Sequence, residues 1–151
     1  MANINNINTY IANLAILNGQ LHNLHFNVVG SQFPAVHVFL EEVYTELFEY
    51  YDAAAELLKI QGQYPQVKYS DYLAAATVKE YESKDFSIRE ALEILKEDLD
   101  TQIALALTIR KEADEADDFE WANLMEDHLE YYRKKLWFVR SMLVPTCGHG
   151  K

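Results

Sequence analysis

The chain has 151 residues, half of them apolar, and its 24 acidic and 13 basic side chains give a net charge of −11. These values predict a single domain, 1–151, with a sizeable core and short tails at about 1–4 and 145–151, and they exclude an intrinsically disordered protein. The sequence has no apolar run of about 20 residues and no basic leader segment, so we expect neither a membrane span nor a signal peptide. The lone Cys147 excludes an internal disulfide and fits a reducing compartment, so the expected location is cytoplasmic.

The charge is unevenly distributed along the chain. No Lys or Arg precedes Lys59, whereas six carboxylates do: Glu41, Glu42, Glu46, Glu49, Asp52 and Glu56. An acidic surface repels the phosphates of nucleic acids and attracts cations. Acidity alone is explained by solubility, but the spacing of the histidines and carboxylates described below favours cation binding.

Two long helices are predicted in the first part of the chain. From about residue 5 to residue 28, apolar side chains recur three and four apart, as on a helix with one buried face. Gly30 is expected to end this helix. The second helix, 31–61, has Ser31 as its candidate N-cap and Pro34 in its first turn. Its core stripe consists of Val36, Leu40, Val43, Leu47, Ala54 and Leu58.

Two further long helices follow a connection, 63–85, that is too long for a simple turn. The run YSDYLAAATV within it is compatible with a short helix. Ser87 to Glu90 has the form of a capping box and begins the third helix. The acidic run DEADDFE predicts a turn, and the last helix extends to about Leu143. Because a long crossover joins two parallel helices of a bundle, the pattern predicts an all-α four-helix bundle with the crossover between helices two and three.

The second predicted helix also carries a polar stripe. His37 and Glu41 are four residues apart, as are Asp52 and Glu56, so each pair lies on one face. At about 3.6 residues per turn, all four side chains fall within an arc of roughly 100°. The turn between the first two helices brings His25 alongside them. Imidazole and carboxylate together bind iron(II), and carboxylates suit iron(III), so these residues are candidate iron ligands.

The two ends of this stripe are too far apart to bind one ion. At about 1.5 Å per residue, Glu41 and Asp52 are separated by roughly 16 Å along the helix axis. Either the pairs are unrelated structural or surface side chains, or an antiparallel second copy completes each site. A two-fold axis near Glu46 or Leu47 would place the first pair of one chain against the second pair of another and create two identical sites.

The runs LHNLHFNVVGSQFPAVHVFLEE, YYDAAAELLKIQG and KKLWFVRSML resemble the Dps family, the small ferritin-like cages of bacteria and archaea. The resemblance implies a ferritin-like four-helix bundle with a short helix in its crossover, assembled as a homo-oligomer of twelve subunits. It implies inter-subunit ferroxidase centres that oxidise iron(II) with hydrogen peroxide or dioxygen and store ferric oxyhydroxide under oxidative stress. Zinc is a competing metal. The metal-binding and catalytic residues implied are His25, His37, Glu41, Asp52 and Glu56.

Two positions beside these ligands depart from the family pattern, since Phe26 stands where Trp is usual and Leu57 where Arg is common. The Glu-x-x-His motif of classical ferritins is absent, which favours the inter-subunit arrangement. His22 is expected to pack or hydrogen-bond beside the site. Tyr44 and Phe48 are expected to pack at the dimer interface or to shield the centre.

An acidic cluster surrounds the start of the last helix. In the Dps family this region lines hydrophilic pores, so the resemblance gives Asp114, Asp118, Glu120 and Asp127, beside Asp117, as pore candidates. The alternative is a solvated turn whose acidic side chains favour the helix dipole.

Two other functions stay open on the sequence alone: a DNA-coating nucleoid protein with secondary iron binding, and a non-catalytic bundle that sequesters zinc or iron. Family members that coat DNA often use a Lys-rich terminal arm. Here the first ten residues carry no Lys or Arg, and the C-terminal tail offers only Lys151. We therefore expect DNA binding to be weak or absent.

Overall fold

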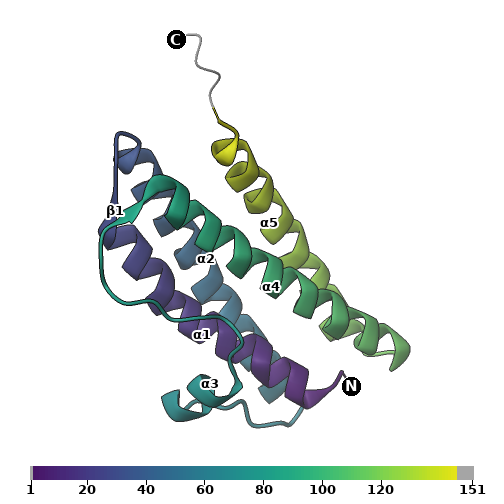
Figure 1. Cartoon of the computed structure of the whole chain (residues 1–151). Helices are drawn as coiled ribbons and strands as arrows, with labels where there is room; N and C mark the ends of the chain where they lie inside the picture. The colour runs from purple at the N-terminus through teal and green to yellow at the C-terminus, as the bar shows by residue number, and fades with distance from the viewer. Residues whose placement is uncertain (1, 146–151) are drawn as a thin grey trace.

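The computed structural model describes residues 2–145. In chain order its elements are α1 (Ile4–Asn27), β1 (Val28–Val29), α2 (Phe33–Ile60), α3 (Tyr69–Ala75), β2 (Phe86–Ser87), α4 (Ile88–Glu115) and α5 (Phe119–Leu143). Figure 1 shows the four long helices packed as a bundle, with α3 in the connection from α2 to α4. The predicted all-α four-helix bundle with a helical crossover is confirmed. The predicted C-terminal tail, with Cys147 and Lys151, lies outside the described residues beyond Pro145.

The core forms from the apolar stripes that the helical periodicity indicates. All six residues of the predicted α2 stripe are buried, with at most 2% of any side chain exposed. On α1 the buried apolar face includes Ile7, Ile11, Leu14, Leu17, Leu21 and Leu24. No helix in the described part of the chain combines the length and apolarity needed to cross a bilayer.

The junction between α1 and α2 differs from the prediction. The N-cap of α2 is Gln32, whose side chain makes no capping hydrogen bond, so the assignment of Ser31 as the cap is wrong. The chain leaves α1 as the extended pair β1 and then turns at Gly30, whose φ is 136°. A Cβ on Gly30 would lie 3.0 Å from Cγ1 of Ile88, so this residue also permits the close approach of α4.

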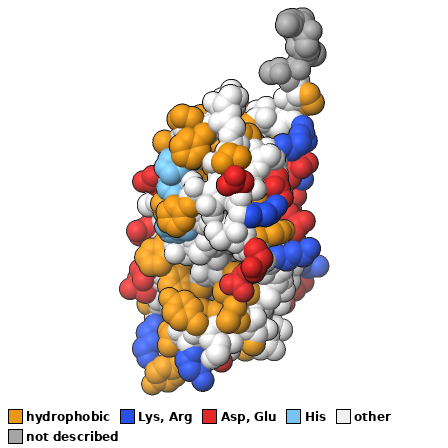
Figure 2. Space-filling view, turned by 60° about the vertical axis from the view of Figure 1, so that its left-hand side comes forward, with side chains coloured by type: hydrophobic (Ala, Val, Ile, Leu, Met, Phe, Trp, Pro, Cys, Tyr) orange, Lys and Arg blue, Asp and Glu red, His pale blue; other side chains and the backbone are white. Residues whose placement is uncertain are grey.

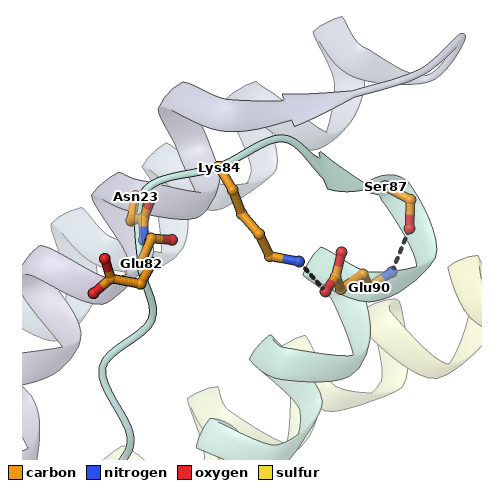
Figure 3. A network of polar contacts seen from close by, with 5 residues as sticks. All are labelled: Asn23, Glu82, Lys84, Ser87 and Glu90. Atoms are coloured by element: carbon orange, nitrogen blue, oxygen red, sulfur yellow. Dashed lines mark hydrogen bonds and ion pairs between the residues drawn. The ribbon is translucent and has the colours of Figure 1, made fainter.

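A short parallel pairing links this junction to the start of α4. Val28 pairs with Phe86 and Val29 with Ser87, a contact that helical periodicity does not predict. Figure 3 shows Ser87 at the beginning of α4, where its hydroxyl accepts the Glu90 N–H at 3.1 Å. The Lys84 ammonium, 2.7 Å from the Glu90 carboxylate, lowers the pKa of that carboxyl, and the Ser87 backbone N–H acts in the same direction. Ser87 therefore caps α4, as the predicted capping box requires of its first residue.

Asparagine side chains of α1 hold the crossover against the bundle. The buried Asn13 accepts hydrogen bonds from the backbone N–H groups of Thr77, at 2.7 Å, and Val78, at 3.3 Å. Nearer the end of α1, Asn23 donates to the carbonyls of Tyr81 and Glu82, and it lies beside Glu82 in Figure 3. These bonds tie the part of the crossover that leads into α4 to α1, which carries His25.

Candidate metal centre

His25 of α1 and His37 of α2 face each other across the turn between their helices. The Nδ1 atom of His25 donates to the His37 carbonyl at 2.8 Å, and the Nδ1 atom of His37 donates to the His25 carbonyl at 2.7 Å. Their rings are stacked, with centroids 3.7 Å apart and planes 13° apart. The two helices therefore hold both imidazoles in one fixed arrangement.

This reciprocal bonding decides which ring nitrogen can bind a metal. A backbone carbonyl can only accept, so the proton of each neutral imidazole sits on Nδ1. The lone pair of each Nε2 atom is then available to a metal ion. A hydrogen bond from the second nitrogen to a backbone carbonyl is the usual support of a metal-binding histidine. His25 is 6% exposed and His37 is half-buried, so the site lies at the edge of the core.

His22 and Tyr44 pack beside this pair. The Nδ1 atom of His22 donates to the Asn18 carbonyl at 2.6 Å, and its ring stacks on Tyr44 at a centroid distance of 3.8 Å. The Tyr44 ring meets the His25 ring edge-on at 5.3 Å. Burial, and then the charge of Glu41, raises the pKa of the Tyr44 phenol. Tyr44 therefore faces both the histidine pair and the first candidate carboxylate.

The carboxylates of the stripe lie along the exposed side of α2. Glu41, Asp52 and Glu56 are all exposed, and none takes part in the ion pairs found between described residues. Glu41 is one turn from His37, whereas Asp52 and Glu56 are about three and four turns further along. Within residues 2–145, no three His, Cys, Asp or Glu side chains are grouped closely enough to hold a metal ion. One chain therefore brings two histidines together and keeps the last two candidate ligands apart from them.

Large apolar side chains are exposed around this stripe. Figure 2 shows histidine side chains at the surface among apolar ones. Phe48, near the middle of the stripe, is 51% exposed. Other exposed apolar residues on α1, α2 and the crossover include Phe26, Phe33, Val38, Ile60, Tyr64, Val67, Tyr69 and Leu73. An apolar surface of this kind is typical of a contact with another protein chain.

Some acidic side chains in the turn before α5 have a structural role. Asp118 is the N-cap of α5, and its carboxylate accepts from the Trp121 N–H at 3.4 Å and from Nε2 of Gln61 at 3.0 Å. Gln61 also donates to Glu120 at 3.2 Å. Asp117 adopts a positive φ of 56° in the turn. The remaining pore candidates, Asp114 and Asp127, are exposed, so this region keeps both a capping role and acidic side chains at the surface.

Buried polar residues form a second group, which was not among the predicted site residues. Tyr10 and Tyr132 are fully buried, and so, within a few per cent, are His128, Asp98 and Gln20. Their positions are in phase with the apolar stripes of α1, α4 and α5, which is the signal that could have identified them. Residue type alone would place Asp98 and Gln20 at the surface.

The chain has clear similarity to known proteins. A family model described as a ferritin-like domain matches residues 4–146. The DNA protection during starvation protein of Brevibacillus brevis is 29% identical over 137 residues, which cover 91% of each chain. The crystal structure of Dps from Staphylococcus aureus has a TM-score of 0.91 and 26% identity, covering 97% of this chain and 100% of that one. Dps from Vibrio cholerae O1, described as a member of a broad superfamily of ferritin-like diiron-carboxylate proteins, has a TM-score of 0.88 and 27% identity, covering 92% and 87%.

Proposed function

The chain belongs to the Dps family of ferritin-like proteins, and we propose that it is a ferroxidase whose iron(II) substrate is oxidised at sites shared between two subunits. The ferric product is stored as an oxyhydroxide in a cage of twelve subunits. The observation that carries the proposal is the opposed pair His25 and His37, whose backbone bonds leave both Nε2 atoms available. The diiron-carboxylate description of the Vibrio cholerae relative supports iron as the metal.

A second chain, antiparallel along α2, would supply the ligands that one chain lacks. Asp52 and Glu56 lie on the same stripe as His37 and Glu41, but even the nearest members of the two pairs, Glu41 and Asp52, are roughly 16 Å apart along the axis. A two-fold axis would exchange the two ends. The exposed Phe48 lies between the ends, where its own copy would cover it. Two such sites per dimer follow from the symmetry.

In this proposal each group has a defined task. The Nε2 atoms of His25 and His37 bind iron(II), while Glu41, Asp52 and Glu56 hold both iron(II) and the harder iron(III). One hydrogen peroxide takes one electron from each of two iron(II) ions. Together with two water molecules this yields two FeO(OH) units and four protons, and it releases no hydroxyl radical. Asp114 and Asp127, with the neighbouring acidic turn, would attract iron(II) toward the shell. Because imidazole and carboxylate also suit zinc, zinc would compete for the ligands.

Native mass measurement combined with anaerobic iron(II) titration tests this proposal. We expect an assembly of twelve chains that binds iron(II) and, after peroxide is added, develops the absorbance of a ferric core. The double variant His25→Ala/His37→Ala should assemble but bind little iron(II). A protein that stays monomeric, or that oxidises iron(II) no faster than buffer does, would contradict the proposal.

A further inference from the structure

A group of polar side chains in the core of the bundle has no part in the proposed iron site. Tyr10 of α1 and Tyr132 of α5 are 0% exposed, and His128 of α5 is 2% exposed. The Tyr10 hydroxyl lies 2.7 Å from Nδ1 of His128 and 2.5 Å from the Tyr132 hydroxyl. Apolar side chains would fill the same space without the cost of desolvating three polar groups. Their convergence on one phenol therefore calls for a chemical explanation.

The proton of the Tyr10 phenol has a ready acceptor. Burial lowers the pKa of the His128 imidazole to about 3, so the ring is neutral near neutral pH and carries one acceptor nitrogen. When Nδ1 accepts the Tyr10 proton, the Tyr10 oxygen can accept the hydrogen bond of Tyr132. An oxidised phenol is a very strong acid, so it loses its proton as it loses an electron. At 2.7 Å that proton can pass to Nδ1 without water.

Aromatic rings connect this phenol to the surface. The Tyr50 ring of α2 stacks on His128 at a centroid distance of 3.7 Å, with planes 8° apart. Tyr131 meets Tyr50 edge-on at 5.6 Å, and both are half-buried. Tyr131 lines a surface hollow together with Glu41 and Glu46. The rings thus lead from a hollow beside one proposed iron ligand to the buried phenol.

We propose that Tyr10 is a redox-active tyrosine that takes up an oxidising equivalent arriving through Tyr131 and Tyr50. The oxidant is an oxygen-centred radical such as hydroxyl radical, which gains one electron and becomes hydroxide. Tyr10 loses that electron and passes its proton to Nδ1 of His128, giving a neutral phenoxyl radical beside an imidazolium. Reduction of the phenoxyl radical returns the proton. The buried radical is out of reach of water and of other chains, which prevents tyrosine cross-linking. This activity goes beyond iron oxidation and does not depend on it.

The test uses iron-free protein kept in chelator, so that the oxidant does not come from the iron reaction. Azide radicals generated by pulse radiolysis remove single electrons, and electron paramagnetic resonance of freeze-quenched samples detects tyrosyl radicals. We expect a long-lived tyrosyl signal whose formation is slower in D2O. Tyr10→Phe should lose more than half of that signal and its solvent isotope effect. The matched control Tyr81→Phe changes a half-buried tyrosine of the crossover that contacts Phe86, and it should keep both.

Tyr50→Phe provides a second variant, since it keeps the stacked ring but removes the oxidisable phenol. It should slow the arrival of the radical at Tyr10, even if Tyr10→Phe proves too unstable to purify. Equal signals in Tyr10→Phe and Tyr81→Phe, or an unchanged rate in Tyr50→Phe with dityrosine forming at exposed tyrosines, would show that the cluster is only a hydrogen-bond network. Peroxide-driven iron oxidation measured on the same variants should be unchanged, so this inference and the ferroxidase proposal can fail separately.

Discussion

Burial shifts the pKa values of two ionisable core residues, Asp98 and His128, in opposite directions. Asp98 on α4 is 5% exposed, and burial raises the pKa of its carboxyl from 3.8 to about 8, with the neighbouring Glu97 adding to the effect. The side chain of Gln20 on α1 partly opposes this shift. In both residues burial favours the neutral form, so Asp98 keeps a proton and His128 releases one. Neither group is charged inside the bundle near neutral pH.

These shifts predict how stability depends on pH. From about pH 4 to pH 8 the folded chain holds a proton on Asp98 that the unfolded chain releases, so stability falls as pH rises. His128 has the opposite effect, because the folded chain loses stability as pH falls from 6.5 toward 3. Of these two residues, only Asp98 contributes between pH 6.5 and 8. There the free energy of unfolding should fall by up to about 1.4 kcal/mol per pH unit. Asp98→Asn should remove most of this slope in urea unfolding followed by circular dichroism.

The control for this experiment is Asp100→Asn on the same helix. Asp100 is exposed and pairs with Lys96 at 2.9 Å. Its substitution should change the free energy of unfolding little and leave the pH dependence of that free energy in place. Parallel pH profiles for the wild type and Asp98→Asn would show that Asp98 is ionised in the folded chain.

At the scale of elements, the turn between α1 and α2 positions His25 against His37, and Gly30 is the most constrained residue of this turn. Its φ of 136° is rarely adopted by other residues, and an added Cβ would lie 3.0 Å from Ile88 Cγ1. Gly30→Ala should therefore destabilise the fold by about 1–3 kcal/mol. Gly19→Ala is the matched control, since Gly19 is an exposed residue within α1 with no atom near its added Cβ. It should stabilise the chain by about 0.5–1 kcal/mol. Equal urea midpoints for the two variants would contradict this account of the turn.

Local periodicity explains which elements were predictable. The α2 stripe from Val36 to Leu58 and the polar stripe beside it follow from one helical repeat, and the structure buries the whole apolar stripe. Ser31 was the wrong cap because the pairing of Val28 with Phe86, distant in sequence, directs the chain through Gly30. The reciprocal bonds of the histidine pair also depend on that turn. Hydrogen bonding between Tyr10 and His128 joins helices 118 residues apart, beyond any local pattern.

At the scale of the assembly, the shared site predicts that two inactive variants complement each other. His37→Ala removes a ligand at one end of the stripe and Asp52→Ala removes one at the other. In mixed cages, an interface between unlike chains holds one site with both defects and one intact site. Mixing should therefore restore part of the iron oxidation rate, measured by ferric absorbance after refolding the chains together. Mixing His37→Ala with Glu41→Ala is the control, because both changes lie at the same end and no intact site can form. No recovery in cages verified to be mixed would exclude a site shared across α2.

The whole-molecule charge predicts weak binding to DNA, although relatives carry the name DNA protection during starvation protein. The net charge is −11, and no Lys or Arg precedes Lys59. Lys84, Arg89, Lys96 and Arg110 are each paired with an acidic side chain. Of the basic cluster on α5, Arg133 and Lys134 are exposed, whereas Lys135 packs over the ring of Phe138.

Duplex DNA is bound mainly by neutralising its phosphates, so few basic side chains on an acidic shell should give little affinity. We expect no gel shift of plasmid DNA by the purified cage at about 0.15 M salt, where unpaired surface charges are screened beyond about 8 Å. A chelator must be present, because a divalent ion could bridge the acidic surface to phosphate. The positive control is the same cage with a Lys-rich peptide fused ahead of Ala2, which should shift the plasmid and lose the shift at higher salt. A saturable shift by the unmodified cage in chelator would contradict the prediction that the net charge of −11 governs its contact with DNA.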